Sequence, residues 1–223
     1  ALAGVFMEAF KAGGGTIVAE QMHEDKKASY RSELATLSGA GGDALALFAY
    51  YAGSGMTIMR QSLENDFFGK FIGADGMLAQ EVIDELGADS LRGKVVFTAA
   101  TSDFDSGSYK DFADIFSATG GDPKAPYATQ SYDAVMLLAL ALQHAGGATR
   151  DLKASLNAVA SPPGIKVGPA DWAEAKAALE AGNDIDYDGA AGSLDFDANG
   201  DVSGLYGMNV VGDDGKWKQT LME

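Results

Sequence analysis

Apolar and polar positions along the first hundred residues alternate between a helical spacing and the spacing of buried strands. The opening residues predict a helix, because their apolar side chains recur on one helical face: Leu2, Val5, Phe6, Ala9 and Phe10. The glycines at 13–15 end this helix, since glycine tolerates the left-handed conformation of a helix cap. Residues 16–20 (TIVAE) then predict a β-strand.

The same alternation continues as far as residue 99. Short apolar or β-rich runs predict strands at 43–50, 70–72 and 93–99. Runs with helical spacing predict helices at 30–37, 54–63 and 79–86. Strands that alternate with helices of about ten residues are typical of βαβ units, so we predict a mostly parallel sheet.

After Thr101 the pattern changes to helices with little strand between them. Helices are predicted at 108–118, 125–145, 149–158 and 171–181. The tail is antiparallel in character, with strands predicted at 192–196, 205–211 and 216–221. Asn199-Gly200 and Asp214-Gly215 separate these strands, and such pairs are strong hairpin signals.

The chain opens in a helix, without a preceding strand that would begin a βαβ unit. A doubly wound sheet normally starts with a strand. We therefore expect this chain to be the downstream piece of a longer protein. The alternative is a fold that simply begins with a helix.

Composition narrows the functional classes. The 223 residues carry 32 acidic and 16 basic side chains, a net charge of −16, which disfavours nucleic acid and anionic lipid as partners. The absence of cysteine excludes thiol catalysis, thiolate metal sites and disulfides. No apolar run approaches the roughly 18 residues of a membrane span.

The sequence gives little support to an enzymatic function. The only histidines are His23 and His144; neither lies in a nucleophile motif, and both are expected at the surface. We expect no catalytic residues, no cofactor and no metal. The segment from Asp195 to Asp201 matches the first half of a calcium loop, but Tyr206 stands where the bidentate glutamate should be, so a hairpin turn is favoured over a calcium site.

Two loops are stronger candidates for binding. Residues 50–55 (YYAGSG) follow one predicted strand, and residues 73–76 (GADG) follow the next. Open α/β sheets bind ligands at the carboxyl ends of their strands. Asp75 suits an ammonium group through a charge-assisted hydrogen bond, and Tyr51 offers a ring and a hydroxyl. From spacing alone, a turn-forming role for Asp75 stands equal to a binding role.

Segments across the chain resemble the leucine/isoleucine/valine-binding protein family, the type I periplasmic binding proteins of ABC importers. The segments that carry the resemblance are residues 44–51, 58–61, 71–76, 127–135 and 192–201, with the strands from 206. The resemblance implies an α/β fold of two doubly wound lobes joined by crossover strands, with one lobe incomplete in this chain. It assigns residues 1–98 to the second lobe without its first strand, 99–203 to the end of the first lobe, and 204–223 to closing strands that return to the second lobe.

The resemblance also implies roles for three residues. Asp75 matches the acidic position that binds the ligand's ammonium group, where branched-chain-specific members usually carry glutamate. Tyr51 matches an aromatic residue that covers the bound amino acid. Tyr127 matches an aromatic residue of the side-chain pocket, and its hydroxyl hints at a more polar ligand than leucine.

The function implied is that of a periplasmic substrate-binding protein that captures an amino acid, branched-chain or related, or an amide between two lobes by hinge closure. It would act as a monomer and deliver its ligand to an ABC permease in the inner membrane. The alternative is a ligand sensor of the same fold that serves a regulator or chemoreceptor. A more distant alternative is an α/β enzyme with Asp75 as general base.

Overall fold

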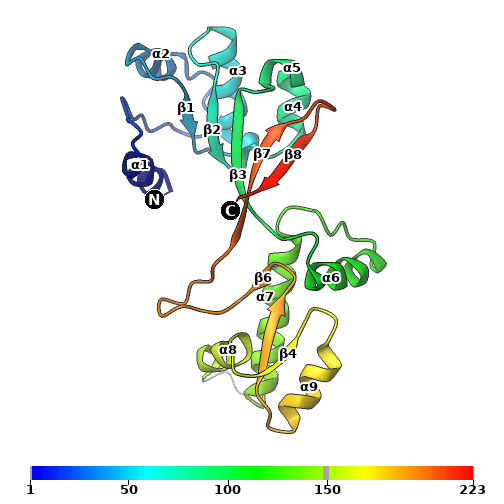
Figure 1. The fold of residues 1–223 in the computed structure, drawn as a ribbon. Coiled ribbons are helices and arrows are strands. Elements are labelled where there is room, and N and C mark those ends of the chain that lie inside the picture. The colour runs from blue at the N-terminus through cyan, green and yellow to red at the C-terminus, as the bar shows by residue number, and fades with distance from the viewer. Residues whose placement is uncertain (1, 148–150, 223) are drawn as a thin grey trace. The chain divides into compact units, whose positions relative to one another are not determined.

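The computed structural model describes residues 2–147 and 151–222, which form two compact units (Figure 1). Unit 1 comprises Ala1–Ala99 and Gly207–Thr220, and unit 2 comprises Ala100–Tyr206 and Leu221–Glu223. The main stretch of unit 2, Ala100–Tyr206, thus lies in the sequence between the two stretches that build unit 1.

Unit 1 contains a five-stranded sheet in the order β1-β2-β3-β7-β8. Its strands are β1 (Leu45–Leu47), β2 (Phe71–Ala74), β3 (Val95–Thr101), β7 (Leu205–Val211) and β8 (Trp217–Leu221). β1, β2 and β3 are parallel, with Leu47 opposite Gly73 and Gly73 opposite Phe97. The parallel sheet predicted from the alternating pattern is therefore confirmed.

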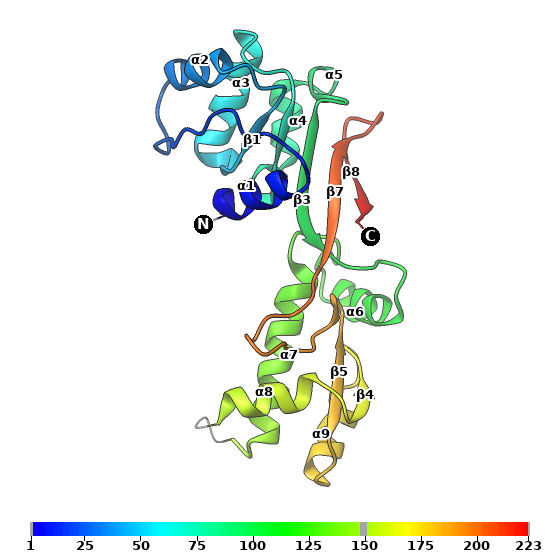
Figure 2. The same cartoon turned by 60° about the vertical axis from the view of Figure 1, so that its left-hand side comes forward.

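Helices surround this sheet. They are α1 (Leu2–Ala12), α2 (Arg31–Gly39), α3 (Met56–Glu64), α4 (Gln80–Leu86) and α5 (Ala88–Leu91). Two short helical segments follow β1 and β2 directly: η1 (Tyr51–Gly55) and η2 (Asp75–Met77). Figure 2 shows α1 beside the sheet and apart from α2 and α3. None of the residues of α1 is buried.

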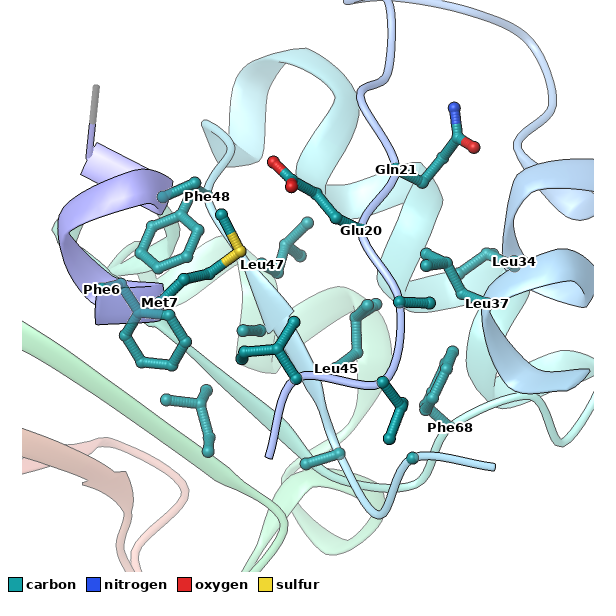
Figure 3. A pocket seen from close by; sticks show the side chains of 18 of the residues that line it. Phe6, Met7, Glu20, Gln21, Leu34, Leu37, Leu45, Leu47, Phe48 and Phe68 are labelled. Carbon is teal, nitrogen blue, oxygen red and sulfur yellow. The ribbon is translucent and has the colours of Figure 1, made fainter. Parts of the chain in front are cut away.

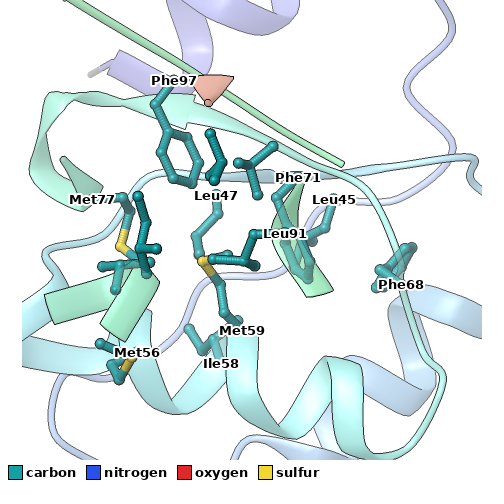
Figure 4. Packing of buried hydrophobic residues seen from close by; sticks show 14 of the residues in the cluster. Leu45, Leu47, Met56, Ile58, Met59, Phe68, Phe71, Met77, Leu91 and Phe97 are labelled. Carbon is teal, nitrogen blue, oxygen red and sulfur yellow. The ribbon is translucent and has the colours of Figure 1, made fainter. Parts of the chain in front are cut away.

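The core of unit 1 lies between the sheet and α3, α4 and α5 (Figure 4). Phe71 and Phe97 from the strands meet Met59 from α3 and Leu91 from α5, and all four are almost fully buried. Burying side chains of this size contributes about 1.5–3 kcal/mol each, so this cluster holds the sheet to its helices.

The last two strands close unit 1 as a hairpin. The Asn209 side-chain amide donates to the Phe97 carbonyl (3.2 Å), and the Trp217 indole N–H donates to the Ala79 carbonyl (3.0 Å). The turn predicted near Gly215 is present, and Gly215 has a φ of 72°. The hairpin predicted at the tail is confirmed.

In its described residues, unit 2 contains four helices and short strands. The helices are α6 (Gly107–Ala118), α7 (Ala128–His144), α8 (Leu152–Ala160) and α9 (Trp172–Glu180). Strands β4 (Ile165–Val167) and β5 (Ile185–Gly189) are parallel, and β6 (Gly192–Ser193) is antiparallel to β5. Leu140, Val159 and Ile185 form the centre of its core.

Three sequence expectations differ from the structure. Residues 16–20 are not a strand, because no neighbouring strand pairs with their backbone in the described structure. β1 is shorter than the predicted run over 43–50. β4 and β5 were not predicted, since each has only three to five residues and lies between strong helical patterns. The start of the helix predicted at 149–158 lies outside the described residues.

Candidate functional site

The two candidate loops of unit 1 meet at one edge of the sheet. β1 and β2 are parallel neighbours, so their carboxyl ends lie at the same edge. η1 follows β1 and η2 follows β2, and the two segments contact each other. The structure therefore brings Tyr51 and Asp75, which begin η1 and η2, to the same edge.

Glycines make this close contact between the loops possible. A Cβ added at Gly76 would lie 2.6 Å from the Ala49 carbonyl oxygen, and one at Gly55 would lie 2.2 Å from the Met77 sulfur. A Cβ at Gly73 would lie 2.6 Å from the Leu47 carbonyl oxygen. Real Cβ atoms do not approach so closely, so a side chain at these positions would separate β1 and its loop from β2 and its loop.

Tyr51 and Asp75 are each only partly buried. The Tyr51 ring packs against the edge of the unit 1 core. The Asp75 carbonyl accepts a hydrogen bond from the Leu78 N–H (2.8 Å), which closes the turn of η2. Asp75 therefore forms the turn that its alternative role requires, and the residue is partly exposed at the ends of the strands. Next to Tyr51, Tyr50 is 75% exposed.

Tyr127 belongs to unit 2, where it precedes α7. Its φ of 62° is left-handed, which is unusual for a residue with a bulky side chain. Such strain costs on the order of 1–3 kcal/mol and clusters at functional sites. Its ring is 42% exposed. The Tyr127 carbonyl accepts a hydrogen bond from the Ser131 N–H (2.9 Å), which closes the first turn of α7.

A group of polar residues at the start of α7 was missed by the sequence analysis. The Thr129 and Ser102 hydroxyls are 2.8 Å apart and buried, and the Gln130 side-chain amide donates to the Thr101 carbonyl (3.3 Å). Buried hydroxyls that bond to each other fix the start of the helix that carries Tyr127. Thr129 and Gln130 lie within the segment 127–135, but nothing in their types distinguishes them from ordinary helix residues.

Asp133 in the same segment is the most buried carboxyl group of the described chain. It accepts hydrogen bonds from the Tyr187 hydroxyl (2.8 Å) and from the N–H groups of Ala190 (2.9 Å) and Ala191 (2.8 Å). Burial raises the pKa of this carboxyl, and these three donors oppose the rise. Asp133 ties α7 to the end of β5, so its role in unit 2 is structural.

The histidines and the calcium-like segment have local structural roles. His23 is half-buried with its ring edge-on to Tyr30, so the expectation of a surface position is wrong for this histidine. His144 is exposed, as expected, and its Nδ1 lies 3.1 Å from the Ser155 hydroxyl. The Asp197 carboxylate accepts from the N–H groups of Asn199 and Asp201. The hairpin turn favoured at this segment is confirmed by the antiparallel bridge that flanks it. Within residues 2–147 and 151–222, no cluster of acidic, histidine or cysteine residues is placed to hold a metal.

The described helices also bear on the membrane question. None of those within residues 2–147 and 151–222 is both long and apolar enough to cross a bilayer.

The sequence matches the family described as "Receptor family ligand binding region" over residues 2–211. Among curated proteins, it is similar to the chemotactic signal transduction system substrate-binding protein BasB of Halobacterium salinarum. The two are 28% identical over 144 residues, which are 57% of this chain and 35% of BasB.

Solved structures share the fold along the whole chain. The leucine binding protein LivK of Thermotoga maritima is 21% identical, with a TM-score of 0.73, over 100% of this chain and 56% of LivK. The LivJ protein of Streptococcus pneumoniae, solved with isoleucine, is 22% identical, with a TM-score of 0.64, over 99% of this chain and 55% of LivJ. A solute binding protein of R. palustris, solved with benzoate, is 20% identical, with a TM-score of 0.60, over 97% of this chain and 53% of that protein.

The chain thus spans about half the length of these solved relatives. Its mixed α/β architecture is the type I periplasmic-binding-protein fold, as the sequence resemblance implied. Both the family and these relatives are ligand-binding proteins. Because the match extends over residues 2–211, the chain belongs to the family described as "Receptor family ligand binding region".

Proposed function

We propose that this chain is part of an extracytoplasmic solute-binding protein of an ABC importer, which binds an amino acid or amide and makes or breaks no bond. The observation that carries the proposal is the contact of η1 with η2 at the carboxyl ends of β1 and β2. This contact places an aromatic residue, Tyr51, and a carboxylate, Asp75, at the edge where open α/β sheets bind ligands.

The charge of Asp75 favours a ligand with an ammonium group. An ammonium that loses its water needs a compensating charge, which a carboxylate supplies through a short hydrogen bond. A ligand whose only charge is a carboxylate would instead be repelled by Asp75. The benzoate named for the R. palustris protein is such a ligand, so we favour amino acids over benzoates for this chain.

Tyr127 supports a ligand with some polarity in its side chain. The ring is partly exposed, and its strained backbone is fixed by α7. In the proposal, Tyr127 lines the side-chain pocket and its hydroxyl offers one hydrogen bond there. We assign unit 1 to the second lobe and unit 2 to the end of the first lobe as part of the same proposal.

The test is calorimetry on the intact protein with a panel of amino acids, their amides and benzoates. We expect Asp75→Ala to weaken amino acid binding by about tenfold or more, because leaving one member of a buried charge pair alone costs roughly 2–5 kcal/mol. The matched control is Glu81→Ala, which removes an exposed carboxylate from α4 in the same unit. Unchanged affinity in Asp75→Ala would exclude Asp75 from the site, and tight binding of benzoates alone would refute the ligand class.

A second function is favoured by one finding, the similarity to the chemotactic substrate-binding protein BasB. In this alternative the ligand-bound chain signals to a chemoreceptor instead of delivering its ligand to a permease. Uptake of the labelled ligand into vesicles that contain the permease separates the two functions. Stimulated uptake supports the importer, and ligand binding without uptake supports the sensor. Monomeric state and a periplasmic location belong to the importer proposal.

A further inference from the structure

Three aromatic residues, Phe48, Tyr50 and Tyr51, follow β1 in the chain. Phe48 lines an apolar groove beside α1, and its ring centroid lies 5.2 Å from that of Phe6 (Figure 3). The Tyr51 ring packs against the core of unit 1. Tyr50 does not line the groove and is 75% exposed, more than any other aromatic residue of the described chain. Of the three rings, only that of Tyr50 is thus largely open to solvent.

The backbone of Tyr50 is fixed although its side chain is exposed. Tyr50 is extended (φ −97°, ψ 141°), and its carbonyl accepts hydrogen bonds from the N–H groups of Gly53 and Gly55, both at 3.0 Å. Gly55 in turn lies against η2, because a Cβ added there would be 2.2 Å from the Met77 sulfur. A side chain on a fixed backbone loses less conformational freedom when it meets a ligand, which favours a role in binding.

The Tyr50 ring lies beside the segment that carries Asp75. A Cβ added at Gly76 would be 3.2 Å from Cδ1 of Tyr50, a distance shorter than most real Cβ contacts. The lack of a side chain at Gly76 therefore lets the ring lie directly against the residue that follows Asp75. Because β1 and β2 are parallel neighbours, the ring and the carboxylate belong to the same edge of the sheet.

An aromatic ring beside a carboxylate suits an organic cation. The face of a tyrosine ring is electronegative and attracts an ammonium group within about 6 Å of the ring centroid. A carboxylate accepts a charge-assisted hydrogen bond from the same group. The ring attracts the positive charge and needs no N–H group, so both side chains can act on one ammonium at once. A ligand without a positive charge receives neither attraction at full strength.

We propose that Tyr50 is a specificity-determining residue of the proposed ligand site, and that its ring contacts the ammonium group that Asp75 binds. The site then selects amino acids and amino acid amides, which carry an ammonium group, over neutral amides that carry none. This inference rests on the proposed function, and it adds to the site a residue that the family resemblance does not single out.

The test is calorimetry on the intact protein with the twenty common L-amino acids as probes. We expect Tyr50→Leu to weaken the binding of each amino acid that the unmodified protein binds by about fivefold or more, because leucine keeps apolar bulk but lacks the ring face. Tyr50→Phe keeps the ring and should retain the affinity within about twofold. Thermal unfolding should give Tyr50→Leu and the unmodified protein similar Tm values, because the ring is exposed. The matched control is Phe10→Leu, which removes another exposed ring from unit 1 and should leave affinity unchanged.

A double-mutant cycle shows whether Tyr50 and Asp75 act on the same group of the ligand. We expect Tyr50→Leu to reduce affinity less in the Asp75→Ala protein than in the unmodified protein, because the ammonium is no longer held beside the ring. Equal reductions in the two proteins would show that the residues act independently, which would overturn the inference.

The outcomes separate this inference from the proposed function. If Asp75→Ala weakens binding and Tyr50→Leu does not, the role of Tyr50 is overturned while the proposed site stands. The same holds if Tyr50→Phe loses as much affinity as Tyr50→Leu. If no amino acid binds, or if neither Asp75→Ala nor Tyr50→Leu changes affinity, the proposed function fails and this inference fails with it.

Discussion

At the scale of single residues, the strongest anchor of unit 2 is the carboxylate of Asp133. Three donors from the end of β5 meet its two oxygens, and the side chain is 1% exposed. Asp133 lies in the segment 127–135, which carries the resemblance to the family, but no sequence pattern assigns a role to this residue. A buried carboxylate is recognised only when its partners, distant in sequence, are known.

We predict that Asp133→Asn lowers the free energy of unfolding by about 1–3 kcal/mol, because the amide leaves one of the buried N–H groups of Ala190 and Ala191 without an acceptor. Urea denaturation measures the loss. The control Asp111→Asn removes an exposed charge from α6 of the same unit and should change little. Equal stability of the two variants would contradict the anchoring role.

Glu33 gives a prediction about protonation. The ion pair with Lys27 and the Ser32 hydroxyl lower the pKa of Glu33 to about 2. Since the folded pKa is below the ordinary value, the contribution of this pair to stability is present above that value and is lost as pH falls toward 2. We expect Lys27→Met to move the pKa of Glu33 back toward 4.5, its ordinary value, in an NMR titration. Lys26→Met is the control, and an unchanged pKa after loss of Lys27 would disprove the assignment.

At the scale of elements, the packing of η1 on η2 depends on glycine. We predict that Gly76→Ala lowers stability by about 1–3 kcal/mol and also weakens ligand binding, because the new methyl group collides with the Ala49 carbonyl and moves η2. Gly69→Ala is the matched control, since open space surrounds the Cβ it adds. Thermal unfolding and calorimetry measure both effects. If the two variants behaved alike, the loops would not be held by this contact.

The elements that the sequence predicted correctly are those with a long or repeated pattern. α3, α4 and α7 showed helical spacing over two or more turns, and β2 and β3 were apolar runs bounded by glycine or charge. β4 and β5 are too short to show a period of their own, and they are strands because α8 and α9 pack against them. Residues 16–20 have the composition of a strand but have no strand beside them, which composition cannot reveal.

The candidate site was predictable in part for a physical reason. In a parallel sheet, the residues that follow neighbouring strands must share an edge, so the prediction of β1 and β2 already placed Tyr51 near Asp75. The strained backbone of Tyr127 and the hydroxyl pair of Ser102 and Thr129 depend on how α7 begins. The roles of Tyr51, Asp75 and Tyr127 in binding stay predictions.

At the scale of the whole molecule, the two units have separate cores. Met59 belongs to the core of unit 1, and Leu140 belongs to that of unit 2. A protein with independent cores need not unfold in one step. Local stability then depends on the unit in which a side chain is truncated.

We therefore predict that Leu140→Ala, which costs about 2–5 kcal/mol, speeds hydrogen exchange in β5 more than in β2. Met59→Ala should do the reverse. Exchange followed by mass spectrometry reports both strands in one experiment. Equal acceleration of the two strands by either variant would show that the units unfold together.

The discontinuous build of unit 1 has a consequence for biosynthesis. Its sheet needs β7 and β8 beside β3, yet these strands follow residues 100–204, which belong to unit 2. A ribosome that has released residues 1–99 has therefore produced most of this unit with the outer edge of β3 still bare. The main stretch of unit 2, Ala100–Tyr206, emerges without interruption and can fold before β8 is made. Completion of unit 1 must await β7 and β8, so a nascent chain stalled before residue 205 would need protection from aggregation at that edge.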